Sequence, residues 1–101
     1  MVQHIGLQRE DERGRTLAHF GEEGIPVEVV DLAPGDSTCV RFIDPYGNTV
    51  FNQLQLPVLI GELEQMVRSS ASEEFRKRVT SVVSFVAESK GVHRYVRFIG
   101  D

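Results

Sequence analysis

The chain has 101 residues, of which 41% are hydrophobic and 26% charged, and its formal net charge is −4. These values are typical of one folded domain, residues 1–101, and argue against a disordered chain. The lone cysteine, Cys39, excludes an intrachain disulfide. No apolar run reaches the roughly 20 residues of a membrane helix, and no basic and apolar leader opens the sequence. We therefore expect a cytoplasmic protein without membrane contact.

The charge is unevenly placed along the chain. Residues 1–50 carry four arginines against nine acids, whereas residues 51–101 carry seven bases and six acids. An acidic N-terminal half disfavours nucleic acid, whose phosphates need clustered Lys and Arg. It suits a basic protein partner, and the alternative is a merely solubilising surface.

The first half of the chain is predicted to form up to five consecutive strands. Short turns that contain glycine or proline separate them. The segments are 2–9, 16–20, 27–32, 37–44 and 48–54. Pro34 and Gly35 occupy the two central positions that a type II turn prefers. Strands joined in this way predict an antiparallel β-meander.

The pattern changes to helical spacing after Leu56. Residues 57–70 place Leu59, Leu63 and Met66 on one face, with Pro57 in the first turn. A second helix follows to about residue 90, capped by Ser70 or Ser72 and stopped by Gly91.

The expected apolar stripe of the second helix is Phe75, Val79, Val82 and Val86.

A last strand at 92–100 completes an α+β fold of two layers. In this fold a helical hairpin covers one face of the sheet, and the C-terminal strand returns beside an early strand or in the middle. The letters VRFI occur at both 40–43 and 96–99. We interpret the repeat as two central strands with the same packing requirement.

The segment 44–47, DPYG, is predicted to be a tight turn. Asp44 is placed to accept a hydrogen bond from the backbone two residues on, and Pro45 presets φ. Gly47 would take a left-handed conformation, as in a type I turn with a G1 bulge.

A polar set around this turn is the candidate ligand-binding site: Arg41, Tyr46, Asn52 and Gln53. These side chains could line a pocket where the sheet meets the helices. The alternative is that they hydrogen-bond to the backbone at a sheet edge or helix start.

Catalytic and metal-binding patterns are missing from the sequence. His4, His19 and His93 lack metal-site spacing, although His4 and His19 could meet across the first hairpin. Cys39 is expected mid-strand as a buried thiol. The acids of EDE (10–12) and EE (22–23) are expected in solvated turns. We assign no catalytic residue, no metal and no cofactor.

The stretch FIDPYGNTVFNQLQ, followed by a helix with Glu and Leu and ended by FIGD, resembles small bacterial α+β proteins that share a DPYG(D/N)TVFN-like segment. The resemblance covers roughly residues 40–101 and implies a compact domain, without an activity or a catalytic residue. In size and charge the chain also resembles immunity proteins that neutralise bacterial toxins.

Three functions therefore remain open. The leading hypothesis is a non-catalytic module that binds a protein partner or forms a homo-oligomer. The second is a small-ligand binder or minor enzyme that uses the polar set around residue 46. The third is an immunity-like inhibitor of a basic toxin.

Overall fold

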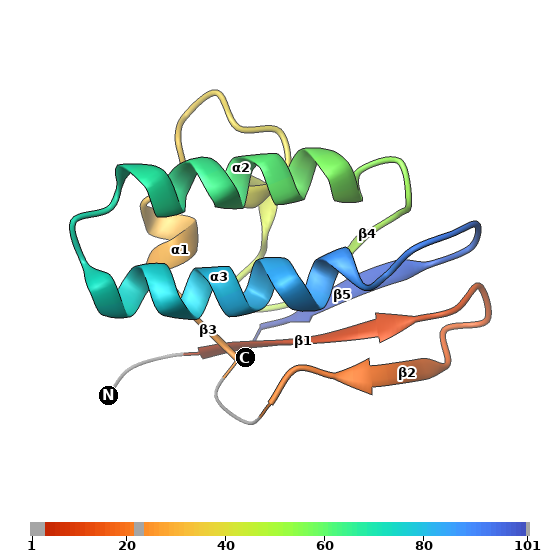
Figure 1. Cartoon of the computed structure of the whole chain (residues 1–101). Helices are drawn as coiled ribbons and strands as arrows, with labels where there is room; N and C mark the ends of the chain where they lie inside the picture. Colours follow the sequence, from red (N-terminus) through yellow and green to blue (C-terminus); the bar gives the residue numbers. More distant parts are fainter. Residues whose placement is uncertain (1–3, 22–23, 101) are drawn as a thin grey trace.

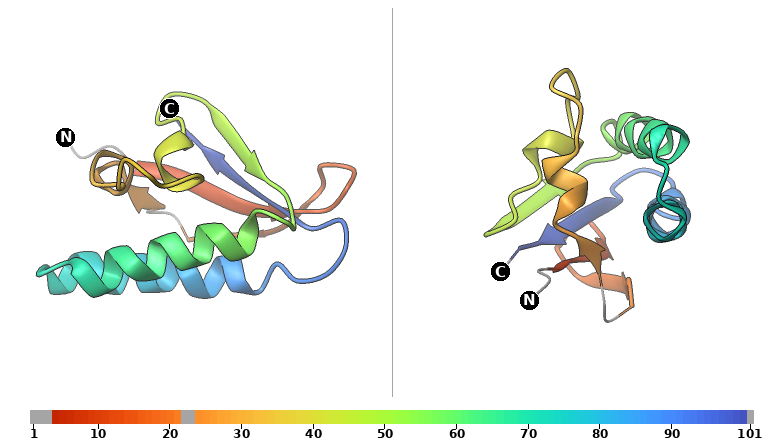
Figure 2. Two further views of the ribbon diagram at one scale, coloured as in Figure 1. Left: turned by 90° about the horizontal axis from the view of Figure 1, so that it is seen from above. Right: turned by 90° about the vertical axis from the view of Figure 1, so that its left-hand side faces the viewer.

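A computed structural model of the chain describes residues 4–21 and 24–100. Five strands and four helical segments make up its α+β fold, and α2 and α3 lie side by side across one face of the sheet (Figures 1 and 2). The strands are β1 (His4–Glu10), β2 (Thr16–His19), β3 (Ile25–Pro26), β4 (Asn48–Phe51) and β5 (Tyr95–Ile99). The helices are α1 (Glu28–Asp31), the 3-10 helix η1 (Val40–Phe42), α2 (Leu56–Ser69) and α3 (Glu73–Ala87).

The predicted fold class is confirmed, and the last strand does return to the middle of the sheet. The strand order is β2-β1-β5-β4, every pairing is antiparallel, and β3 pairs with β1. The C-terminal strand β5 thus separates β1 from β4, which are far apart in the sequence. The described helices are too short or too polar to cross a membrane.

The core lies between the sheet and the two long helices. Because side chains alternate along a strand, Leu7, Val96 and Phe98 face α2 and α3 and are almost completely buried. The predicted helix stripes are also confirmed. Their buried members are Leu59, Leu63 and Met66 of α2 and Val79, Val82 and Val86 of α3.

Both helices begin as the sequence indicates. Pro57 lies in the first turn of α2, where its missing N–H costs no hydrogen bond. Of the two serines proposed as caps, Ser72 is the N-cap of α3 and accepts a hydrogen bond from the backbone N of Phe75 at 3.1 Å. The helix ends at Ala87, so Lys90 and Gly91 belong to the loop that follows it.

Two of the predicted strands are wrong. Residues 27–32 contain α1, because β3 ends at Pro26, which has no N–H to continue the ladder. The helical turn then places Val29 inside and leaves Glu28 and Asp31 exposed. Residues 37–44 contain η1 and form no strand. The strand beside β4 is β5 instead. The VRFI repeat therefore adopts a 3-10 helix at its first occurrence and a strand at its second.

The carboxylate of Glu62 on α2 holds η1 in place. It accepts hydrogen bonds from the backbone N of Thr38 at 2.7 Å, Cys39 at 3.1 Å and Val40 at 2.9 Å. Burial opposes ionisation, but these bonds outweigh it and hold the pKa of Glu62 below its usual value. The backbone donors that a strand would offer to a neighbour are satisfied by this side chain instead.

The turn at 44–47 is confirmed in part. Asp44 accepts from the backbone N of Tyr46 at 2.8 Å, as predicted. Gly47, however, is not left-handed. A side chain there would require the Asp44 carboxylate to shift, since a Cβ atom would lie 2.7 Å from Asp44 Oδ2. The turn after α1 also differs, because Ser37 N donates to Pro34 O and makes Pro34 the first residue of the turn.

Candidate functional site

Three connections meet at one end of the molecule, which we call the loop end. They are the β1–β2 turn (11–15), the β4–α2 loop (52–55) and the α3–β5 loop (88–94), all on the right of Figure 1. The start of α2 and the end of α3 form the helical side of this surface. Segments from both halves of the chain therefore contribute to it.

A pocket of about 470 Å³ lies at the loop end between α2 and α3. Two strongly exposed apolar side chains line it, Leu54 from the β4–α2 loop (79% exposed) and Val92 from the α3–β5 loop (64%). Its walls are apolar and comprise Leu56, Pro57 and Ile60 of α2 and Val86 and Ala87 of α3. A pocket of this size and lining can accept a side chain or a small molecule.

Hydrogen bonds fix the backbone around this pocket. Asn52 Oδ1 accepts from the backbone N of Leu54 at 2.9 Å and of Gln55 at 3.1 Å. Gln55 Oε1 in turn accepts from Asn52 N at 2.9 Å, the reciprocal arrangement that orders the start of a helix. Gln53 Oε1 accepts from His93 N at 2.6 Å and so joins the two loops that line the pocket.

His93 adopts a backbone conformation that is rare for its residue type. Its φ is +61°, in the left-handed region that costs an ordinary residue about 1–2 kcal/mol. The bond to Gln53 and the antiparallel pairing of β5 hold the residue there. Such strain is concentrated at functional sites, which makes the α3–β5 loop a place to look for one.

The four residues predicted to bind a ligand are divided by β4. Arg41 and Tyr46 precede that strand, whereas Asn52 and Gln53 follow it at the loop end. Arg41 Nε donates to Ser37 O at 2.6 Å, and its guanidinium lies 4.4 Å from the centre of the Phe42 ring. Tyr46 is 75% exposed. Of the four, only Gln53 lines the pocket.

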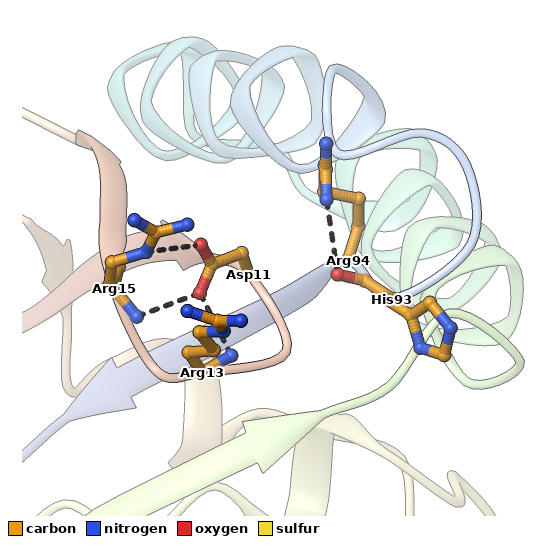
Figure 3. A network of polar contacts seen from close by, with 5 residues as sticks. All are labelled: Asp11, Arg13, Arg15, His93 and Arg94. Atoms are coloured by element: carbon orange, nitrogen blue, oxygen red, sulfur yellow. Dashed lines mark hydrogen bonds and ion pairs between the residues drawn. The ribbon is translucent and has the colours of Figure 1, made fainter.

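The acids at 10–11 are not solvated, and that prediction is wrong. Asp11 is buried in the β1–β2 turn, where it accepts from the backbone N of Arg13 and Arg15 and pairs with Arg15 Nε at 2.8 Å (Figure 3). Burial raises the pKa of Asp11, but the hydrogen bonds from Arg15 and Arg13 outweigh it and lower the value. The EE pair at 22–23 lies outside the described residues.

Glu10 is buried on the sheet face away from the long helices. Its carboxylate accepts from Arg97 Nε at 2.7 Å and from Gln8 Nε2 at 2.5 Å. Burial raises the pKa of Glu10, and the bonds from Arg97 and Gln8 more than reverse the effect. Sequence reasoning could not find this pair, because its members lie 87 residues apart.

The loop end carries cations without an ion-pair partner among the described residues, beside the acids Asp11, Glu12 and Glu88. Arg13, Lys90 and Arg94 form no ion pair with any residue in the described ranges, whereas Arg15 is neutralised by Asp11. Figure 3 shows Arg13 in the β1–β2 turn and Arg94 just before β5, with their guanidinium groups well apart and the His93 ring turned away from the Asp11 cluster. Of these three cations, Lys90 lines the pocket.

One buried polar group beside this pocket has no partner. Ser89, on the loop just after α3, is 9% exposed and lines the pocket, and its backbone N donates to Val86 O at 2.9 Å. Within residues 4–21 and 24–100, its Oγ atom makes no hydrogen bond. A buried hydroxyl without a partner is uncommon in folded proteins.

The three histidines and the cysteine lie in separate parts of the fold. The predicted meeting of His4 and His19 is wrong, because His4 pairs with Pro26 and His19 pairs with Gln8. No group of three His, Cys, Asp or Glu side chains in the described part of the chain could hold a metal ion. Cys39 precedes η1, and burial and the Glu62 carboxylate raise the pKa of its thiol.

A second pocket, of about 450 Å³, lies at the opposite end of α3. Leu32, Phe75 and Arg78 are among the residues that line it. Its charged side chains have both signs, and Arg78 already contacts His4 and Glu74. The loop end differs because three of its cations form no ion pair within the described ranges and its pocket adjoins the Ser89 hydroxyl.

Comparison with known proteins adds no family to this description. No family model matches the chain, and neither the curated proteins nor the solved structures contain a match.

Proposed function

We propose that this chain is a non-catalytic protein-binding module. Its loop end receives an acidic segment of another protein, and one side chain of that segment enters the pocket between α2 and α3. The observation that carries the proposal is the strong exposure of Leu54 and Val92 beside the same apolar pocket. Exposed apolar groups around a pocket gain free energy when a partner removes them from water.

The charge of the loop end selects the kind of partner. Arg13, Lys90 and Arg94 are available to acidic side chains, which would speed the encounter and favour an acidic segment over a basic one. Two copies of the chain that met through their loop ends would bring these cations together. A different protein, rather than a second copy, is therefore the occupant that the charges favour.

Selection from a random peptide library on the immobilised protein tests this function. We expect enrichment of peptides in which an apolar or aromatic residue is flanked by Asp or Glu. The substitutions Leu54→Asp and Val92→Asp should abolish binding of the enriched peptides. Leu32→Asp is the matched control, since Leu32 is 64% exposed and lines the other pocket.

Three results would contradict the proposal. They are enrichment of basic peptides, the absence of any consensus, and equal loss of binding in the Leu32→Asp control. Light scattering of the purified chain across concentrations tests the choice of partner. A dimer that Leu54→Asp dissociates would show that a second copy occupies the loop end.

A further inference from the structure

We propose that the anchor of the partner segment is a tyrosine. Its ring fills the pocket between α2 and α3, and its phenolic hydroxyl forms a hydrogen bond with Ser89. This inference rests on the proposed function and adds to it the identity of the side chain that enters the pocket.

The state of Ser89 requires a partner of this kind. The residue is 9% exposed and its Oγ has no hydrogen-bond partner among the residues that the structure describes. Its backbone N–H is satisfied by the bond to Val86 O at 2.9 Å, whereas its hydroxyl is not satisfied. The Oγ atom is itself inaccessible in the isolated chain, so the proposed bond requires Ser89 to rotate about χ1 to another staggered position when the ring binds.

The walls of the pocket determine what can reach that hydroxyl. They consist of Leu56, Pro57, Ile60, Val86 and Ala87, and they would leave a fully polar side chain without hydrogen bonds. The volume of about 470 Å³ is ample for one aromatic ring. The fitting group therefore has an apolar body and one hydrogen-bonding atom at its tip, as tyrosine does.

Charge at the helix end disfavours the other obvious candidate, a carboxylate. Ser89 follows the C-terminus of α3, where the aligned peptide dipoles give a partial negative charge. A neutral phenol avoids this repulsion, and it can either donate to the serine oxygen or accept from it. The acidic residues of the partner segment then remain at the rim, near Lys90.

Two peptides that differ by one oxygen atom test the inference. Acetyl-Glu-Tyr-Glu-amide and acetyl-Glu-Phe-Glu-amide are titrated into the ¹⁵N-labelled protein, and amide shifts give the affinities. We expect the tyrosine peptide to bind about fivefold more tightly, the ratio for one neutral hydrogen bond. The shifts should include Leu54, Ser89 and Val92.

Variants of two serines provide the control. Ser89→Ala should remove the preference for tyrosine while leaving the phenylalanine peptide unaffected. Ser84→Ala, an exposed position on α3, should retain the preference. Because the Ser89 hydroxyl has no partner, its removal is not expected to unfold the protein.

The outcomes separate the inference from the function. Equal affinity of the two peptides at the loop end, or a tyrosine preference that survives Ser89→Ala, would overturn the inference and leave the function standing. If neither peptide shifts the amide signals of these residues at millimolar concentration, both the inference and the proposed function are contradicted.

Discussion

The substitution Glu62→Gln tests whether one carboxylate decides that residues 40–42 form η1. Each oxygen of Glu62 serves two donors, Oε2 those of Thr38 and Oε1 the backbone N–H groups of Cys39 and Val40. Glutamine keeps one accepting oxygen and turns an amide NH₂ toward the other pair. Bonds to a charged group contribute about 1.5–3 kcal/mol, and partial exposure of Glu62 reduces that figure. We expect a loss of about 1–2 kcal/mol.

The loss should depend on pH. The pKa of folded Glu62 lies below its usual value of 4.5, so its stabilisation is complete above that value and disappears as the pH falls through the folded pKa. Urea unfolding of the wild type and of Glu62→Gln should therefore differ at neutral pH and converge in acid. Glu10 and Asp11 also have lowered pKa values, but they are present in both proteins and cancel in the difference.

Glu64→Gln is the matched control, since Glu64 is exposed on the same helix. Its effect should stay within about 0.5 kcal/mol at all pH values. The reasoning would be refuted if Glu62→Gln unfolded at the same urea concentration as Glu64→Gln at neutral pH. It would also be refuted if the difference between wild type and Glu62→Gln grew in acid.

Three further predictions concern other parts of the fold. Arg97→Ala should lower the free energy of unfolding by about 2 kcal/mol, because it leaves the buried Glu10 carboxylate without its cation; urea unfolding measures the loss. His93→Gly should unfold no more easily than the wild type and gain up to about 1 kcal/mol, since glycine adopts φ of +61° without strain; a lower thermal midpoint would contradict this. Cys39 should react with a thiol reagent only as fast as the protein opens, because its thiol is buried and its pKa is raised; rapid labelling of the folded chain would contradict this.

The helices of this protein could be predicted because their determinants are local. The spacing of Leu59, Leu63 and Met66, the proline at 57 and the cap at Ser72 all lie within the segments that they define. The strands β1, β2, β4 and β5 were also recognisable from alternation and from the turns between them. These signals require no knowledge of the rest of the chain.

The VRFI repeat shows where such reasoning fails. The first three letters of the repeat form a 3-10 helix at 40–42, and the same letters form part of a strand at 96–98, so the difference is not encoded in the repeat. At the second copy, β1 and β4 offer backbone partners on both sides. At the first, Glu62 supplies the acceptors from 22 to 24 residues away. Tertiary contacts thus override an equal local preference.

Of the residues that line the pocket, only Gln53 is predicted from the sequence as a site residue. Leu54 and Val92 are ordinary apolar residues in the sequence, and Ser89 is one serine among several in the helical half. Their exposure or burial becomes visible only when the β4–α2 and α3–β5 loops are brought to the same end of the sheet. Arg41 and Tyr46 precede β4, whereas the loop end lies after it.

The loop end combines exposed apolar side chains with a backbone that is held unusually firmly for loops. Gln53 joins the two loops through His93, Asn52 and Gln55 satisfy each other at the start of α2, and Asp11 closes the β1–β2 turn. A surface ordered before its partner arrives loses less conformational entropy on binding. The left-handed His93 belongs to the same arrangement, because the hydrogen bond from its backbone N to Gln53 keeps the α3–β5 loop, and with it Val92, beside the pocket. Ordered loops, unpaired cations and an unsatisfied hydroxyl together favour recognition of a defined segment over nonspecific adhesion.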